Sequence, residues 1–388
     1  MTELNLENKR IEVIDALRGF AMMSIILIHN IEHFDFYYFP SEFPDWLKTT
    51  DKAVWGTLFF VFVGKSYGIF SILFGFSFYV QLESQKRKGK SFTGRFLWRM
   101  LILLVLSALN TTFFEGDIMS FYAVMAIFLV IVQHWDNRSV LIFASILLFQ
   151  PWLWFQFFSS MIYPILGEPS HLSDTYYKLI PNYLGANSFW EVVKFNQTKG
   201  RMAMVLWLWE NGRFFQAPAL FMIGMLLGRT GFFYNSFENF KLWKKLFWTG
   251  LAFFIILITL NFFLSELILN PTSKATFKLI FTTWHNFAFI IVLVTAFLLV
   301  FPNQKVYPYL NFFIPFGKMS LTNYLLQSIL GSVIYYGFGF GLYKYTGASY
   351  SLAIAVIMIF IQWIFTVWWL KSHKQGPLEW LWHKATWI

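Results

Sequence analysis

Long apolar runs separated by short polar loops constrain the fold of this chain more than any other feature. A helix needs about 20 mostly apolar residues to cross a hydrocarbon core. Helices are expected at residues of about 12–31, 54–82, 97–114, 118–134, 139–164, 214–229, 245–265, 277–301, 312–338 and 349–370. The sequence therefore predicts an all-α fold, a polytopic bundle of about ten transmembrane helices in a single domain over residues 1–388.

The composition excludes an ordinary soluble protein. Hydrophobic residues make up 57% of the chain and charged residues 13%, against roughly 45–50% and 25% in globular domains. Aromatic residues reach 22%, and Trp and Tyr are enriched where a membrane meets water. We therefore expect an integral membrane protein surrounded by a lipid bilayer.

Basic residues gather in loops beside the apolar runs, and this pattern predicts the orientation of the chain. The strongest cluster lies within residues 84–99. Cytoplasmic loops carry an excess of Lys and Arg, so both termini are expected in the cytoplasm, with the protein in the inner membrane. Because the net charge of +10 is spread over such loops, no nucleic-acid partner is expected. Residues 166–212 then form an extracytoplasmic loop, which we expect to be an ordered cap.

The first apolar run carries ionisable groups at both of its ends. Residues 19–28 are uncharged; Asp15 and Arg18 precede them, and His29 and Asn30 follow. Eleven residues are almost three helical turns, so Arg18 and His29 share one face, roughly 16 Å apart along the axis. Ionisable groups at membrane depth are functional by default. The alternative is that Arg18 extends to the headgroups and His29 simply lies at the interface.

Four strings, in order along the chain, carry a family resemblance. They are IDALRGFAMMSIILIHN (14–30), KSYGIFSILFGFSF (65–78), GKMSLTNYLLQSI (317–329) and GPLEWLW (376–382). The first resembles the opening helix of the transmembrane acyltransferase superfamily, in which an arginine is followed eleven residues later by a histidine. All four together are similar to the YeiB-like family of bacterial membrane proteins.

The resemblance implies an acyltransferase that uses acyl-CoA, with acetyl-CoA as the leading candidate, as its co-substrate. Its phosphates would dock at the cytoplasmic end near Arg18 and Lys318, with Asp15 fixing Arg18. The thioester would lie near His29, which would act as the base toward a hydroxyl or amine on a small molecule, lipid or envelope glycan. Asn30 or Asn286 would stabilise the oxyanion.

Further polar residues in the apolar runs are candidates for the same cavity. His285, beside Asn286, is a second candidate base, and the alternative is a buried histidine bonded to a neighbouring helix. Asn323 and Gln327 share one helix face, and such stripes also bond helix to helix. The remaining cavity candidates are Lys65, Ser66, Asn110 and Glu115, whereas Asp117 is expected to be a plain loop acid.

The sequence also limits the alternatives. With no cysteine, disulfides and thiolate catalysis are excluded. One histidine pair, His29 and His33 beside Glu32, has the spacing of metal ligands, and we expect no metal. A transporter that uses the same polar path is an alternative function, although no repeat between the two halves supports it. A non-catalytic membrane protein is the other. The acyl group, the acceptor and the oligomeric state are left open.

Overall fold

The chain folds into a bundle in which all regular structure of the described residues is helical. The computed structural model describes residues 12–34, 40, 42–163, 171–234 and 236–387. Its first half contains α1 (Glu12–His29), η1 (Asn30–Phe34), α2 (Asp45–Phe62), α3 (Lys65–Arg87), α4 (Thr93–Thr111), α5 (Met119–Met125), α6 (Ile127–Val132), α7 (Asn137–Leu148), α8 (Pro151–Ile162), α9 (Leu172–Tyr177), α10 (Ile180–Leu184), α11 (Phe189–Phe195) and η2 (Asn196–Gly200).

The second half continues with α12 (Arg201–Glu210), α13 (Arg213–Arg229), α14 (Phe237–Glu266), α15 (Pro271–Val300), α16 (Tyr307–Asn311), α17 (Ile314–Lys318), α18 (Ser320–Tyr335), η3 (Leu342–Lys344), α19 (Ala348–Leu370) and α20 (Pro377–Thr386).

Among the described residues, seven helical stretches are long and apolar enough to cross a membrane, so the chain is an integral membrane protein. They are Glu12–Glu32, Asp45–Arg87, Thr93–Thr111, Asn137–Ile162, Phe237–Glu266, Pro271–Val300 and Ala348–Leu370. Two predicted spans are shorter in the structure: α18 has 16 residues, and the stretch around α5 and α6 is Met119–Val132. A third, α13 (Arg213–Arg229), agrees with its predicted bounds of 214–229 but has only 17 residues. The prediction of about ten spans is therefore supported for seven of them.

Two of the long stretches are interrupted where the sequence disfavours a continuous helix. Between α2 and α3, Gly64 adopts a left-handed conformation with φ of 76°, which glycine tolerates at little cost. Between α7 and α8, Gln150 has φ of 63° and precedes Pro151, a position that disfavours helical geometry. The first interruption brings the N-terminus of α3 into the middle of the bundle.

Glycines let the helices around α1 approach closely. A methyl group at Gly317 of α17 would overlap the backbone carbonyl of Asp15, and one at Gly19 would overlap that of Phe313. The crossing of α3 and α13 is built in the same way, with Gly75 against Phe221 and Gly224 against Ile72. Small residues at such crossings are how membrane helices gain packing contact without a hydrophobic driving force.

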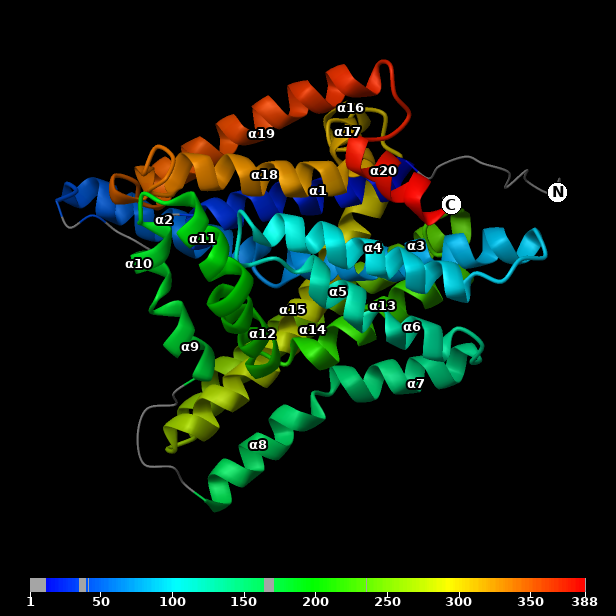
Figure 1. Cartoon of the computed structure of the whole chain (residues 1–388). Coiled ribbons are helices and arrows are strands. Elements are labelled where there is room, and N and C mark those ends of the chain that lie inside the picture. The colour runs from blue at the N-terminus through cyan, green and yellow to red at the C-terminus, as the bar shows by residue number, and fades with distance from the viewer. Residues whose placement is uncertain (1–11, 35–39, 41, 164–170, 235, 388) are drawn as a thin grey trace.

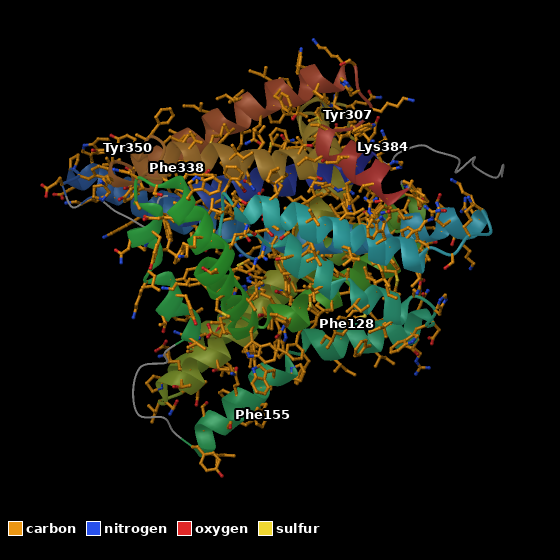
Figure 2. The ribbon with its side chains drawn as sticks, viewed as in Figure 1. Phe128, Phe155, Tyr307, Phe338, Tyr350 and Lys384 are labelled. Atoms are coloured by element: carbon orange, nitrogen blue, oxygen red, sulfur yellow. The ribbon has the colours of Figure 1, made fainter. Side chains whose placement is uncertain are left out.

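The bundle has two distinct ends. The short helices α9–α12 cover one end, while α20 lies at the other, and α1 runs between them through the centre (Figure 1). Figure 2 shows Phe338 and Tyr350 near the first end and Tyr307 and Lys384 near the second. In the span that contains α1, 72% of the apolar stretch is buried inside the protein, against 11% in α14. The polar groups on α1 therefore face other helices more than lipid.

Candidate functional site

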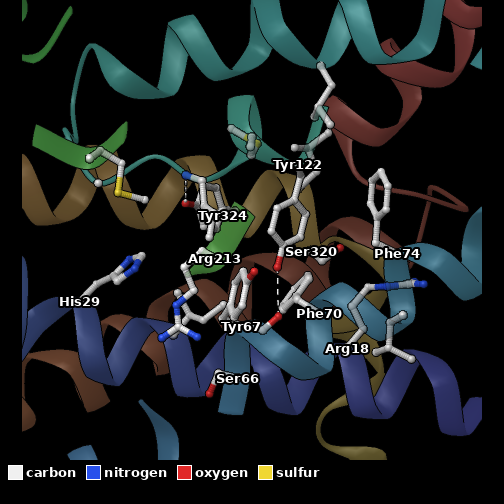
Figure 3. A pocket seen from close by; sticks show the side chains of 18 of the residues that line it. Arg18, His29, Ser66, Tyr67, Phe70, Phe74, Tyr122, Arg213, Ser320 and Tyr324 are labelled. Carbon is white, nitrogen blue, oxygen red and sulfur yellow. Dashed lines mark hydrogen bonds between the residues drawn. The ribbon is translucent and has the colours of Figure 1, made fainter. Parts of the chain in front are cut away.

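A single cavity of about 760 Å³ runs through the bundle beside α1. Its lining includes Arg18 and Lys318 at the α20 end and His29 and Glu115 at the end covered by α9–α12. Figure 3 shows Arg18 and His29 on opposite sides of this cavity. At 1.5 Å per residue, the eleven residues between them correspond to a separation of roughly 16 Å along the helix axis. One continuous space therefore joins a cationic end to a histidine end.

Three basic residues line the cationic end. Arg18 Nη1 lies 3.1 Å from Asp15 Oδ1, and Arg18 Nη2 donates to Ser77 Oγ at 3.0 Å. Lys318 reaches the lining from the end of α17, which packs on α1 at Gly317. The Arg99 guanidinium lies 3.6 Å from the ring centre of Trp382. Asp15 is 1% exposed, so this contact with Arg18 is made from within the protein.

Aromatic rings surround His29 at the other end. Its ring centre lies 4.7 Å from that of Phe114 and 6.3 Å from that of Tyr324. Glu115 is buried and accepts a hydrogen bond of 3.2 Å from the Tyr336 hydroxyl. The Tyr324 hydroxyl oxygen accepts from the backbone N–H of Ile118 at 3.3 Å. A histidine, a carboxylate and a phenol thus share one largely apolar chamber.

Aromatic side chains line the middle of the cavity. Phe70, Phe74 and Tyr122 line it (Figure 3). The Tyr122 hydroxyl is held by Ser71 Oγ at 2.8 Å and donates to the carbonyl of Tyr67 at 3.0 Å. A largely aromatic passage of this kind favours an extended chain over a compact one.

Five of the thirteen residues proposed from the sequence line this cavity. They are Arg18, His29, Ser66, Glu115 and Lys318. Within the described part of the chain, eight others lie outside its lining: Asp15, Asn30, Lys65, Asn110, His285, Asn286, Asn323 and Gln327. The side chain of His33 and residues 166–170 of the predicted cap lie outside the described residues.

Two of the amides outside the lining join helices. Asn30 donates to the carbonyl of Ile26 at 2.8 Å and accepts from the Tyr335 hydroxyl at 3.0 Å. Asn323 accepts from Thr366 Oγ1 at 3.2 Å, which connects α18 to α19. Gln327 is completely buried. These contacts are those of helix packing, and an oxyanion role for Asn30 stays a prediction.

The prediction for Asp117 is wrong. It is not a plain loop acid, because only 4% of its surface is exposed. Its carboxylate accepts hydrogen bonds from Ser107 Oγ and, at 2.8 Å, from Asn110 Nδ2. Asp117 and Asn110 therefore hold the turn between α4 and α5, next to the Glu115 wall of the cavity.

His285 and Lys65 lie close to the cavity but outside its lining. The His285 ring packs against Phe254, with ring centres 6.1 Å apart. The Lys65 ammonium lies 5.7 Å from the ring centres of both Phe60 and Phe289. Asn286 packs directly on Gly64. These residues form a second polar group in the wall of the cavity.

The sequence reasoning missed Arg99 and Tyr324 of the lining, and two further lining residues, Arg213 and Glu379. Arg213 begins α13, stacks over Tyr67 and Trp207 at 5.1 and 5.7 Å, and donates to Gln216. An arginine at the predicted outer end of an apolar run departs from the positive-inside pattern. That departure could have identified Arg213 as a candidate site residue. Glu379 of α20 was the other, and its contacts lie 57 and 58 residues away in the sequence.

Glu379 caps α18 from the C-terminal helix. It accepts from the backbone N–H groups of Leu321 at 2.7 Å and Thr322 at 3.2 Å, and from Thr322 Oγ1 at 2.6 Å. The α18 N-terminus thus gains both a hydrogen-bond acceptor and a negative charge. Since Glu379 also lines the cavity, this cap fixes one wall of the cationic end.

Replacing Glu379 by alanine should lower the unfolding free energy by about 0.5–2 kcal/mol, the usual cost of a lost cap. Burial raises the pKa of Glu379 above its ordinary value, so its contribution to stability is fully present below the unfolded pKa and declines as pH rises through the folded pKa. Glu379→Gln, which keeps an acceptor, should lose this pH dependence. Thermal unfolding of wild type, Glu379→Ala and Glu379→Gln in detergent measures both effects. A range from about pH 4 to about pH 8 covers the ordinary pKa of Glu and neutral pH. An Ala variant as stable as wild type at every pH would contradict the capping role.

Comparisons with known proteins agree with this architecture. Residues 10–189 match the family model described as "Heparan-alpha-glucosaminide N-acetyltransferase, catalytic", and residues 227–388 match "Protein of unknown function (DUF418)". The chain is 26% identical to YxaH of Bacillus subtilis over 99% of its own length and 96% of that protein. It is 24% identical to YeiB of Escherichia coli over 96% and 95% of the two chains. No solved structure matches it.

The fold and the matched catalytic segment define a class, the multi-span membrane proteins with an acetyltransferase-like N-terminal half. Within that class the chain belongs to the YeiB-like family of bacterial membrane proteins, as the resemblance of its four strings predicts.

Proposed function

We propose that this chain is an integral-membrane acyltransferase. It moves an acyl group from acyl-CoA at the α20 end of the cavity to a hydroxyl or amine acceptor at the end covered by α9–α12. The observation that carries the proposal is the single cavity that joins Arg18 and Lys318 to His29. In the proposed orientation, the α20 end faces the cytoplasm and the covered end faces outward across the inner membrane.

The cationic end fits the phosphates of acyl-CoA. Arg18 is held by Asp15 and Ser77 with its guanidinium in the lining, and Lys318 and Arg99 add two further positive charges. Fixed guanidinium and ammonium groups suit phosphate oxygens. The Trp382 ring, on which Arg99 stacks, offers a flat surface to the adenine base of CoA. The pantetheine arm is an extended, weakly polar chain, which matches the aromatic passage.

At the other end, the reaction needs a base and a donor to the oxyanion. His29 takes the proton from the acceptor as its oxygen or nitrogen attacks the thioester carbonyl. The Tyr324 hydroxyl, whose oxygen accepts from Ile118, keeps its own proton to donate to the oxyanion. When the intermediate collapses, the C–S bond breaks and the CoA thiolate takes the proton from His29. The products are the acylated acceptor and free CoA.

Replacing Arg18 by glutamine should weaken acetyl-CoA binding roughly 10- to 150-fold, because one or two charge-assisted hydrogen bonds of about 1.5–3 kcal/mol are lost. Equilibrium binding of labelled acetyl-CoA to the purified protein in detergent measures the effect. Arg138→Gln, at an exposed arginine, is the matched control.

The change at Arg18 also removes a partner of the buried Asp15, so folding has to be monitored separately. The double variant Asp15→Asn with Arg18→Gln removes both charges and should fold, yet bind as weakly as the single variant. Unchanged affinity in both variants would contradict the phosphate role. If wild type binds no acyl-CoA and vesicles that contain the protein take up the acceptor without modifying it, the result would favour a transporter.

A further inference from the structure

A second group of polar residues, in the wall of the cavity at the break between α2 and α3, has no role in the chemistry above. It consists of Lys65, Ser66, Arg213 and Asn286, gathered around Gly64. An ideal Cβ at Gly64 would lie 2.7 Å from Asn286 Nδ2 and 3.7 Å from Arg213 Nη2. Gly64, Ser66 and Arg213 line the main cavity. Two chain segments far apart in the sequence thus bring an amide and a guanidinium to one point.

Neither cation of this group forms an ion pair with a carboxylate among the described residues, and the Glu32 carboxylate, which lines the same cavity, acts on Arg213 only at longer range. Lys65 is 5% exposed, and its described contacts are the rings of Phe60 and Phe289. Arg213 contacts two rings and the neutral Gln216. The positive charges of Lys65 and Arg213 also act on each other. Burying a cation is costly unless an anion or a set of acceptors compensates for lost water, and neutral rings compensate only in part.

Polar atoms beside these cations also lack partners. Ser66 Oγ and Asn286 Oδ1 are buried, and neither finds a hydrogen-bond partner within the described part of the chain. The two residues are each 4% exposed. Buried polar groups are nearly always satisfied by protein, water or ligand. A bound oxyanion that accepts from Ser66 Oγ would satisfy this hydroxyl beside the two cations, and a hydroxyl group on the same ligand would satisfy Asn286 Oδ1.

The helix ends add to the positive potential. α3 begins at Lys65 and α13 begins at Arg213, and each is preceded by a glycine with no side-chain cap. Free N–H groups and the positive end of the helix dipole favour an anion at such termini. In broken membrane helices, these termini characteristically point at the anionic group of a substrate.

We propose that Lys65, Ser66, Arg213 and Asn286 form a binding site for an oxyanion, a carboxylate or phosphate group, carried by the acceptor. The anion site itself does not depend on the proposed function. Only the assignment of the anion to the acceptor rests on the proposed acyl transfer. The acceptor would lie with its charged group at Gly64 and its hydroxyl or amine toward His29, since both line the same cavity.

The test is the thermal unfolding of the purified full chain in detergent, titrated with inorganic phosphate, acetate, or phosphatidic acid against phosphatidylcholine. A ligand that binds the folded state raises the melting temperature with its concentration. The shift should be lost in Lys65→Met and Arg213→Met, with anion affinity lowered roughly 10- to 100-fold. Lys178→Met, at an exposed lysine, and Arg18→Gln should retain it. Phosphate or acetate acting alone identifies a free anion, and a response to phosphatidic acid only identifies a lipid headgroup.

The stability of Lys65→Met without anion separates binding from structure. Removing a buried cation that lacks an ionic partner should leave the melting temperature unchanged or raise it, even as the anion response disappears. Equal anion shifts in wild type and both methionine variants would overturn the site, as would no shift with any of the four additives. Loss of acyl transfer with an intact anion response would count against the proposed function alone.

Discussion

The variant His29→Ala should lose acyl transfer by roughly 10²- to 10⁴-fold, the usual contribution of a positioned general base. Affinity for acetyl-CoA should stay close to that of wild type, because the phosphates bind at the other end of the cavity, roughly 16 Å away along α1. Single-turnover transfer from labelled acetyl-CoA, beside equilibrium binding of the same compound, separates the two quantities.

The matched control is His134→Ala, since His134 is exposed and outside the cavity lining. Tyr324→Phe removes the proposed oxyanion donor but leaves the aromatic ring beside His29. It should lower the rate of acyl transfer without disturbing the packing around His29. If His29→Ala transfers as fast as wild type, the base lies elsewhere, and His285→Ala then decides whether the second histidine supplies it.

The second large effect is expected at the crossing of α1 and α17. Gly317→Ala places a methyl group against the backbone carbonyl of Asp15, and a backbone cannot move aside as the end of a side chain can. The two helices must separate, at a cost of about 1–3 kcal/mol for overpacking. Since α17 carries Lys318 into the cavity, acetyl-CoA affinity should fall as well.

A matched glycine makes this prediction specific. Gly56 lies in α2, and an added Cβ there meets nothing within 4 Å, so Gly56→Ala should leave the melting temperature unchanged or slightly raised by helix propensity. Thermal unfolding in detergent and acetyl-CoA binding of the two variants give the comparison. Equal stability of Gly317→Ala and Gly56→Ala would show that the close crossing does not hold the cationic end.

The helices were predictable where a local signal decides them. Apolar runs located the long spans, because hydropathy is read within one segment. The start of α2 at Asp45 was missed, since its first turns carry charged residues that a hydropathy argument assigns to a loop. The length of α18 was overestimated for the opposite reason: apolar residues continue past the helix ends, into α17 before it and a turn after it.

Helix spacing was informative about the cavity along α1. The eleven-residue spacing of Arg18 and His29 put them on one face, and both line the cavity. Spacing does not tell a face turned to a cavity from one turned to a neighbouring helix. Asn323 and Asn30 are bonded to α19 and α18 respectively for this reason. Glu379 contacts residues 57 and 58 positions away in the sequence, so no local pattern pointed to it.

The cavity walls come from both halves of the chain, and this has a consequence for how the protein can be divided. Arg18, His29 and Glu115 lie in the segment that matches the acetyltransferase model, whereas Lys318 and Glu379 lie in the segment that matches the model of unknown function. Neither segment alone encloses the passage. The two family models therefore describe complementary parts of one cavity, and an open reading frame encoding either part alone would have to find the other half in trans to rebuild the passage.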